Sequence, residues 1–205
     1  MKKSMGAGVV LVGVILFFIF SKEASWPVKN GPVVRPDIVA FGDSLTQGVG
    51  AAQGMDYPSQ LGELLGVEIV NLGVSGETTA GALRRLDEVI ERDPAAVLLT
   101  LGGNDLKNRL PKEKAFENLR EIVTRLQGVG ALVVVGGLEI PLYGKGFGKA
   151  YEELAKETGA VLVPNVFEGI FGKNQLMSDP IHPNDAGYTI MAGHFHKALS
   201  PHLSL

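Results

Sequence analysis

Short apolar runs alternate with longer amphipathic stretches from residue 37 to the end of the chain, and this alternation strongly constrains the fold. Five runs have the almost continuous apolar composition of buried parallel strands, at 38–41, 67–72, 96–101, 132–135 and 161–163. Between and after them, apolar residues recur every three or four positions, as on the buried face of a helix, at 83–90, 116–126, 151–155 and about 185–199. We therefore predict one domain, a parallel sheet with helices on both faces and right-handed crossovers.

Composition excludes several classes of function. The chain has 205 residues, a formal net charge of -3 and no cysteine. This charge provides no basic surface for nucleic acid, so we expect no nucleic-acid partner. Without cysteine there can be no disulfide, no thiolate nucleophile, no zinc site with thiolate ligands and no lipid-modified cysteine.

The N-terminus has the pattern of an export signal. Lys2 and Lys3 precede an uncharged apolar run at 5–20, and no small-x-small cleavage site follows it. We expect residues 1–25 to be an uncleaved signal anchor that holds the protein on the outer side of the cytoplasmic membrane. The alternative is a cleaved signal peptide and a secreted or periplasmic protein. Residues 26–36 contain three prolines and are predicted to be a linker, or tether, to a domain at 37–205.

Two motifs predict an activated serine. Ser44 follows the first apolar run within Gly-Asp-Ser-Leu, and Asp179-Pro-Ile-His182 directly precedes the last helical stretch. A serine hydroxyl is a poor nucleophile until a base takes its proton, and a carboxylate that fixes the tautomer improves the base. We predict Ser44 as nucleophile, His182 as base and Asp179 as its orienting group. The structural alternative for the first motif is a turn in which Asp43 or Ser44 caps a helix.

Two further loops carry groups that can stabilise negative charge. Gly76 lies in Asn-Leu-Gly-Val-Ser-Gly-Glu-Thr-Thr, where its N–H can donate to a developing oxyanion. Asn104 follows two glycines at the end of the third apolar run, and its side-chain amide can donate to the same oxyanion. Alternatively, the first loop is a plain glycine turn or a phosphate-binding loop at a helix N-terminus. Asp105 is expected to hold its loop in place.

Together, the four motifs resemble the GDSL, or SGNH, hydrolase family, in order and over nearly all of residues 37–199. The resemblance implies a flavodoxin-like three-layer α/β/α sandwich with a five-stranded parallel sheet. It implies a serine esterase that needs neither a metal nor an organic cofactor. The implied oxyanion hole consists of the Ser44 N–H, the Gly76 N–H and the Asn104 amide, with Gly73 as the alternative to Gly76.

The resemblance implies that the loop after Pro141 flanks the acyl site, so this loop bears on the choice of substrate. Gly-Gly-Asn-Asp at 102–105 and Leu-Glu-Ile-Pro at 138–141 are most similar to the bacterial arylesterase, thioesterase I and lysophospholipase L1 branch of the family. That branch usually continues with a Pro-x-Asn-Tyr-Gly-type loop, whereas this chain has Pro-Leu-Tyr-Gly. We expect a small-molecule or lipid ester as substrate, with Tyr143, Met177 and Ile181 as candidate contacts. The alternatives are a polysaccharide O-acetyl esterase and a non-catalytic binding module.

Overall fold

Five parallel strands form one sheet at the centre of the computed structural model, which describes residues 26–140 and 144–205. The sheet order is β2-β1-β3-β4-β5, as in flavodoxin-like folds. The strands are β1 Ile38–Gly42, β2 Ile69–Gly73, β3 Ala96–Thr100, β4 Leu132–Gly136 and β5 Val161–Val163. The predicted parallel α/β fold is therefore confirmed, and each strand overlaps the apolar run from which it was predicted.

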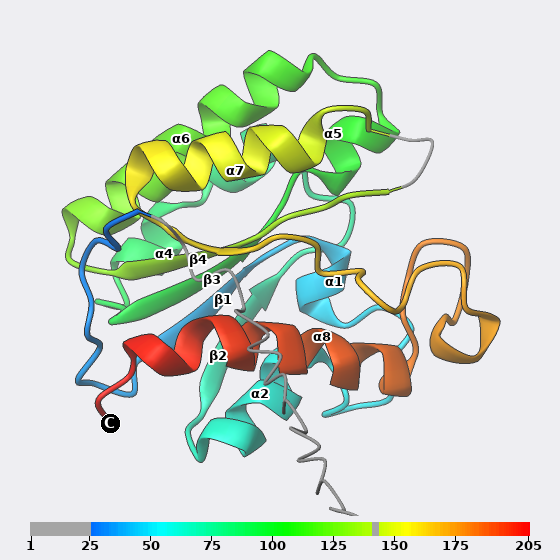
Figure 1. Ribbon diagram of the computed structural model, residues 1–205, viewed down its shortest axis with the longest axis horizontal. Coiled ribbons are helices and arrows are strands. Elements are labelled where there is room, and N and C mark those ends of the chain that lie inside the picture. Colours follow the sequence, from blue (N-terminus) through cyan, green and yellow to red (C-terminus); the bar gives the residue numbers. More distant parts are fainter. Residues whose placement is uncertain (1–25, 141–143) are drawn as a thin grey trace, which may run out of the picture.

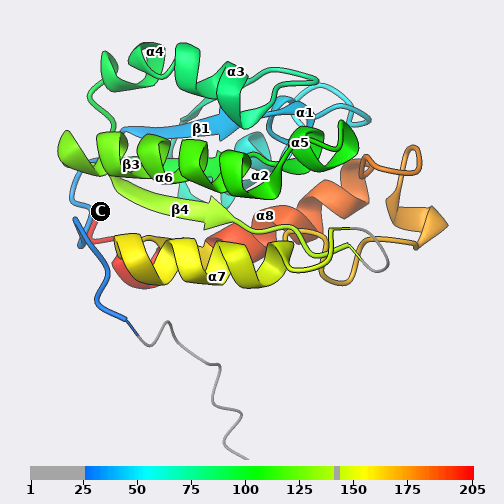
Figure 2. The same cartoon turned by 90° about the horizontal axis from the view of Figure 1, so that it is seen from above.

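Helices cover both faces of the sheet (Figures 1 and 2). One layer contains α2 (Tyr57–Leu65) and α8 (Asp185–Leu199), which pack against each other. The other contains α3 (Thr79–Arg84), α4 (Asp87–Ile90), α6 (Lys112–Gly128) and α7 (Phe147–Thr158). Four further short helices lie after strands, in a loop or directly after α8: α1 Ser44–Gln47, α5 Gly103–Lys107, η1 Asn174–Leu176 and η2 Ser200–His202.

Aromatic pairs join the helices within each layer. Tyr57 of α2 stacks on Phe195 of α8 with ring centroids 4.7 Å apart. Phe116 of α6 meets Tyr151 of α7 edge to face at 4.9 Å. Each such pair stabilises the fold by about 0.5–1.5 kcal/mol beyond the area that it buries. The sheet between the two layers is fully buried in β1, β3 and β4, whereas the edge strand β2 is half-buried.

Two helical features differ from the sequence-based expectation. The pattern at 83–90 predicted one helix, but Arg85 and Leu86 separate α3 from α4, and the Arg85 N–H bonds the carbonyl of Ala82 in a tight turn. Helix α2 was not predicted, although Tyr57, Leu61, Leu64 and Leu65 recur at helical spacing. Its start also has a clear local signal, since the Asp56 side chain accepts the N–H of Ser59 at 3.0 Å.

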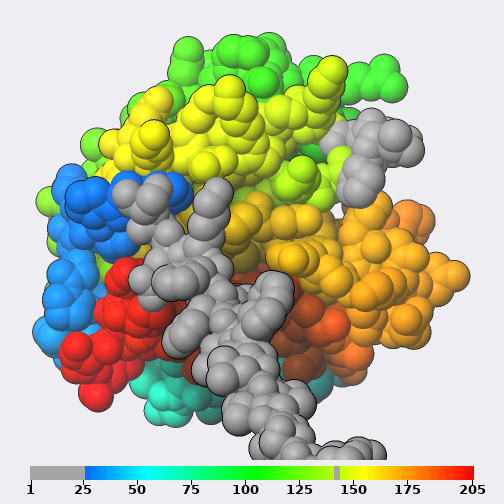
Figure 3. Space-filling view, in the orientation of Figure 1, coloured from blue at the N-terminus to red at the C-terminus, as the bar shows by residue number. Residues whose placement is uncertain are grey.

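The proline-containing segment at 26–36 is held against the domain, which corrects the expectation of a free tether (Figure 3). The Trp26 indole N–H donates to the carbonyl of Ala160 at 3.0 Å. Val33 is 3% exposed, and its N–H and carbonyl bond His202 and Ser204 at 2.7 and 2.8 Å. These contacts hold the segment on the surface of the domain, although its composition predicted no such contacts. The predicted signal anchor at 1–25 lies outside the described residues.

Among the helices of the described ranges, none combines the length and apolarity that crossing a membrane requires.

Candidate active site

Ser44 lies at the first position of α1, directly beyond the carboxyl end of β1. The turn is tight, because a Cβ on Gly42 would collide with the Thr46 side chain and the Thr100 carbonyl. Asp43 caps α1, since its carboxylate accepts the Leu45 N–H at 3.0 Å. The structural interpretation of Asp43 as a helix cap is thus correct, and it leaves the Ser44 side chain at the sheet edge, 9% exposed.

His182 connects Ser44 to Asp179. The His182 Nε2 lies 3.0 Å from the Ser44 Oγ, and its Nδ1 lies 2.7 Å from the Asp179 Oδ2. The other Asp179 oxygen accepts the N–H groups of Ile181 and His182 at 2.8 and 2.9 Å. The structure therefore brings the three residues that the sequence indicated into one hydrogen-bonded chain.

The Asp179 carboxyl is ionised at neutral pH. The hydrogen bond from His182 is the main cause that lowers its pKa to about 2, and the two backbone N–H groups lower it further. An ionised carboxylate can only accept at this position, so the proton of a neutral His182 lies on Nδ1. Nε2 is then free to accept the proton of the Ser44 hydroxyl.

The Asn104 amide lies between the loops of Ser44 and Gly76. Its Nδ2 donates to the Glu77 carbonyl at 2.9 Å and, at a longer 3.3 Å, to the Asp43 Oδ2. Gly76 adopts a left-handed φ of +80° in an exposed part of the loop. Gly73 differs, because its N–H donates to the Asn71 side chain at 2.9 Å and a Cβ there would collide with the α1 backbone.

Two neighbouring polar residues hold these loops. Asp105, which we expected to hold its loop, accepts the N–H and the hydroxyl of Thr79 at 2.9 and 2.8 Å. Asp43 is 3% exposed, and burial raises its pKa to about 7, with the nearby Glu77 and Asp105 contributing. This burial could not be predicted from the sequence, because an Asp that caps a helix after a strand can also lie in an exposed turn.

The loop after α1 buttresses the His182 loop. The Ala52 N–H donates to the Asp185 carboxylate at 2.8 Å, and the Tyr188 hydroxyl donates to the Val49 carbonyl at 2.9 Å. Gly50 has φ +94°, and a Cβ there would collide with the Ser178 side chain. Sequence analysis missed this contact, whose only local signal is a glycine in a loop.

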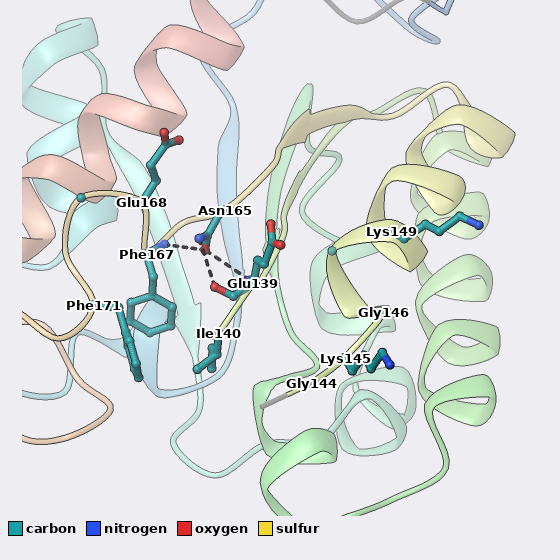
Figure 4. Close-up of a pocket in the computed structure, with 12 residues that line it drawn as sticks. Glu139, Ile140, Gly144, Lys145, Gly146, Lys149, Asn165, Phe167, Glu168 and Phe171 are labelled. Carbon is teal, nitrogen blue, oxygen red and sulfur yellow. Dashed lines mark hydrogen bonds between the residues drawn. The ribbon is translucent and has the colours of Figure 1, made fainter. Parts of the chain in front are cut away.

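The candidate substrate contacts lie in different surroundings. Ile181 is 43% exposed and adjoins His182, whereas Met177 is partly buried against the core. Tyr143 lies outside the described residues. A cleft of about 940 Å³ opens between the segments that follow β4 and β5 (Figure 4). Its walls are both apolar and charged, and they include Ile140, Phe167, Phe171, Glu139, Glu168 and Lys145.

The sequence is similar to those of several named esterases. The esterase TesA of Pseudomonas aeruginosa is 30% identical over 71% of this chain and 79% of the relative. The arylesterase of Vibrio mimicus is 28% identical over 94% and 98% of the two chains. Thioesterase 1/protease 1/lysophospholipase L1 of Escherichia coli K12 is 29% identical over 80% and 83%.

Structure and family model agree with these relatives. A crystal structure of TesA superposes with a TM-score of 0.76, at 28% identity, over 80% of this chain and 98% of that chain. The model of the GDSL-like lipase/acylhydrolase family matches residues 40–190. With an activated-serine geometry at the sheet edge and a family match over most of its length, the chain belongs to the GDSL-like lipase/acylhydrolase family and is a serine esterase.

Proposed function

We propose that the protein hydrolyses carboxylic esters through an acyl-enzyme on Ser44. The observation that carries this proposal is the pair of contacts of His182, whose Nε2 faces the Ser44 Oγ at 3.0 Å and whose Nδ1 faces Asp179 at 2.7 Å. His182 takes the hydroxyl proton as the Ser44 Oγ attacks the ester carbonyl carbon. The resulting imidazolium is stabilised by the ionised Asp179.

The same histidine serves both halves of the reaction. When the tetrahedral intermediate collapses, the bond to the leaving alkoxide or thiolate breaks, and His182 returns its proton to that group. Water then attacks the acyl-enzyme, and His182 takes a proton from this water. Collapse of the second intermediate releases the carboxylic acid and restores the Ser44 hydroxyl. No step requires a metal or an organic cofactor.

The proposed oxyanion hole combines the N–H groups of Ser44 and Gly76 with the Asn104 amide. Gly76 is preferred to Gly73, because the Gly73 N–H is already bonded to Asn71. The Asn104 N–H that makes the longer, 3.3 Å contact with Asp43 is the one that an oxyanion would take over. Losing one such donor typically costs about 2.7–4 kcal/mol of barrier.

For the substrate we propose acyl esters, such as lysophospholipids, aryl or short-chain esters, or thioesters. The relatives' names support this range, since they include an arylesterase and a thioesterase/lysophospholipase. We further propose that the enzyme acts outside the cytoplasmic membrane, with residues 1–25 as signal anchor or, if cleaved, as signal peptide. Cell fractionation with N-terminal sequencing would test this, and intact protein in the cytosol would contradict it.

The decisive experiment compares the wild-type protein with Ser44→Ala on p-nitrophenyl esters from acetate to palmitate. We expect turnover that Ser44→Ala nearly abolishes, and labelling by a fluorophosphonate probe that the same variant prevents. Substantial activity in folded Ser44→Ala would remove the mechanism.

A second comparison sets the substrate class. Lysophosphatidylcholine should be hydrolysed in preference to acetylated xylan. The reverse preference would reassign the enzyme as a polysaccharide O-acetyl esterase.

A further inference from the structure

Arg85 and Glu77 form an ion pair that is almost buried beside the proposed oxyanion hole. Their side chains are 16% and 7% exposed. The Arg85 Nε lies 2.8 and 2.9 Å from the two Glu77 carboxylate oxygens, and its Nη2 also donates to one of them. Glu77 is the residue that follows Gly76, and Arg85 follows the last residue of α3. The pair therefore joins the Gly76 loop to the end of a helix.

Arg85 also anchors this pair to the sheet. Its Nη2 donates to the Leu72 carbonyl at 2.8 Å, near the end of β2, and makes a longer contact of 3.4 Å with the Gly42 carbonyl at the end of β1. The guanidinium carbon lies 4.4 Å from the centre of the Phe41 ring, within the range of a cation–π contact. A planar guanidinium with five donors can serve these partners together, whereas a lysine ammonium cannot.

The backbone of Glu77 completes the connection to the other donor. Its carbonyl accepts the Asn104 Nδ2 at 2.9 Å, the shorter of the two contacts of that amide. One residue is thus bonded through its carboxylate to Arg85 and through its carbonyl to Asn104, and through the chain to Gly76. A Cβ built on Gly76 would meet no other atom within 4 Å, so the position of its N–H depends on the bonds made by the neighbouring residues.

We propose that the Arg85–Glu77 pair is a positioning device that sets the Gly76 N–H and the Asn104 amide for the transition state. The inference rests on the proposed function, because the two donors matter only if an oxyanion forms. A buried ion pair is weak evidence for a stabilising role, since well-packed apolar residues often replace such pairs without loss. Its geometric contribution is more specific, because the pair holds the side chain of the residue next to Gly76 against the ends of β1 and β2.

The proposal predicts a loss in kcat with little change in KM. The oxyanion exists only in the transition state, so misplaced donors leave ground-state binding unaffected. A displacement of about 1 Å can cost about 10²-fold in rate. We therefore expect Arg85→Met and Glu77→Gln each to lower kcat by about 10- to 100-fold. Arg85→Lys should also lower kcat, because a lysine keeps the positive charge but lacks the planar set of N–H donors of the guanidinium.

The double variant tests whether the two residues act together. If the two residues act as one device, Arg85→Met/Glu77→Gln should lose no more kcat than the worse single variant. The double variant also removes both charges, so it leaves no unpaired buried ion that would unfold the protein. Arg120→Met is the matched control, because Arg120 binds Glu157 with Nε and Nη2 at 3.0 and 2.8 Å on the surface between α6 and α7. It should keep wild-type kcat.

The experiment measures kcat and KM on a p-nitrophenyl ester and the rate of labelling by a fluorophosphonate probe, for variants that circular dichroism shows to be folded. Labelling displaces fluoride from phosphorus through a five-coordinate transition state in which negative charge develops on the phosphoryl oxygen. The same donors would stabilise that oxygen, so the labelling rate should fall in parallel with kcat. A folded Arg85→Met with kcat within about twofold of wild type would overturn the inference, and so would single losses that multiply in the double variant. Wild type without Ser44-dependent turnover would instead overturn the proposed function, which separates the two failures.

Discussion

Replacing Asp179 by Asn should disable His182 while leaving the fold almost unchanged. The Asp179 Oδ1 accepts two backbone N–H groups at 2.8 and 2.9 Å, and an Asn oxygen would occupy that place for the same reason. The Asn NH₂ group would then face the His182 Nδ1, where the Asp179 Oδ2 lies at 2.7 Å. Because an NH₂ group only donates, the histidine would accept at Nδ1 and carry its proton on Nε2. It could then no longer accept the proton of Ser44.

The magnitude follows from what an amide flip would cost. Turning the Asn over restores an acceptor for His182 but sets its NH₂ group against two backbone N–H groups. Each donor left without an acceptor would cost about 1–3 kcal/mol if it were buried, and less here, because the Asp179 side chain is 44% exposed and water can bond these N–H groups. The carboxylate charge that stabilises the imidazolium is lost in either orientation. We therefore expect kcat to fall by about 10²- to 10⁴-fold, in line with the replacement of the aspartate in other serine triads.

The assay is p-nitrophenyl ester hydrolysis under saturating substrate, with circular dichroism as a check on folding. Asp87→Asn is the matched control, because Asp87 is an exposed carboxylate that binds Arg125 on the surface. It should keep wild-type activity. Asp179→Asn that retains more than about a tenth of the wild-type kcat would refute the assigned role of the carboxylate.

Three further predictions concern a loop beside the site, the buried carboxyl of Asp43 and the N-terminal segment at 26–36. Gly50→Ala should lower kcat by about tenfold or more, because its Cβ would collide with the Ser178 side chain beside the His182 loop, whereas Gly54→Ala, with φ +78° and open space, controls for backbone strain. Burial raises the pKa of Asp43 to about 7, so the folded form keeps a proton that the unfolded chain releases near pH 4, and stability contributed by this group is lost as pH rises between those values. The free energy of unfolding of Asp43→Asn, measured in urea, should accordingly rise by a few kcal/mol relative to that of wild type between about pH 4 and pH 8. A difference between the two proteins that stays constant over this pH range would contradict the prediction. Trp26→Phe should lower the unfolding free energy by about 0.5–1.5 kcal/mol through the lost indole hydrogen bond without changing kcat, and unchanged stability would indicate that the segment contributes nothing.

The sheet could be predicted from sequence because buried parallel strands leave an almost pure apolar signal. β3 and β4 are buried at every residue, and their runs marked them within a residue or two. Helix α2 carries a shorter signal, since Tyr57, Leu61, Leu64 and Leu65 recur at helical spacing over only nine residues. Its packing on α8 could not be predicted from local periodicity, because the two helices lie more than a hundred residues apart in the chain.

The proposed reacting groups could also be predicted from sequence, and the groups that support them could not. Ser44, Asp179 and His182 each stand in a motif whose residue types are required by the chemistry, and the fold brings them within hydrogen-bonding distance. Arg85 gives no such signal, because an arginine after a helix is ordinary. Its role emerges only from the carbonyls and the ring that surround it in three dimensions.

The carboxylates near Ser44 pose an electrostatic problem that the fold solves in four ways. An oxyanion beside uncompensated acidic groups would be destabilised, and burial would intensify the repulsion. Burial raises the pKa of Asp43 to about 7, which keeps this carboxyl largely protonated below that pH, and Glu77 is paired with Arg85. Asp105 accepts two hydrogen bonds from Thr79, and Asp179 faces the ring that becomes an imidazolium. The cation of Arg85 lies next to the loop whose N–H groups are proposed to receive the oxyanion. Its removal would therefore leave Glu77 as an uncompensated charge there, which is a second, electrostatic reason to expect the loss of kcat in Arg85→Met.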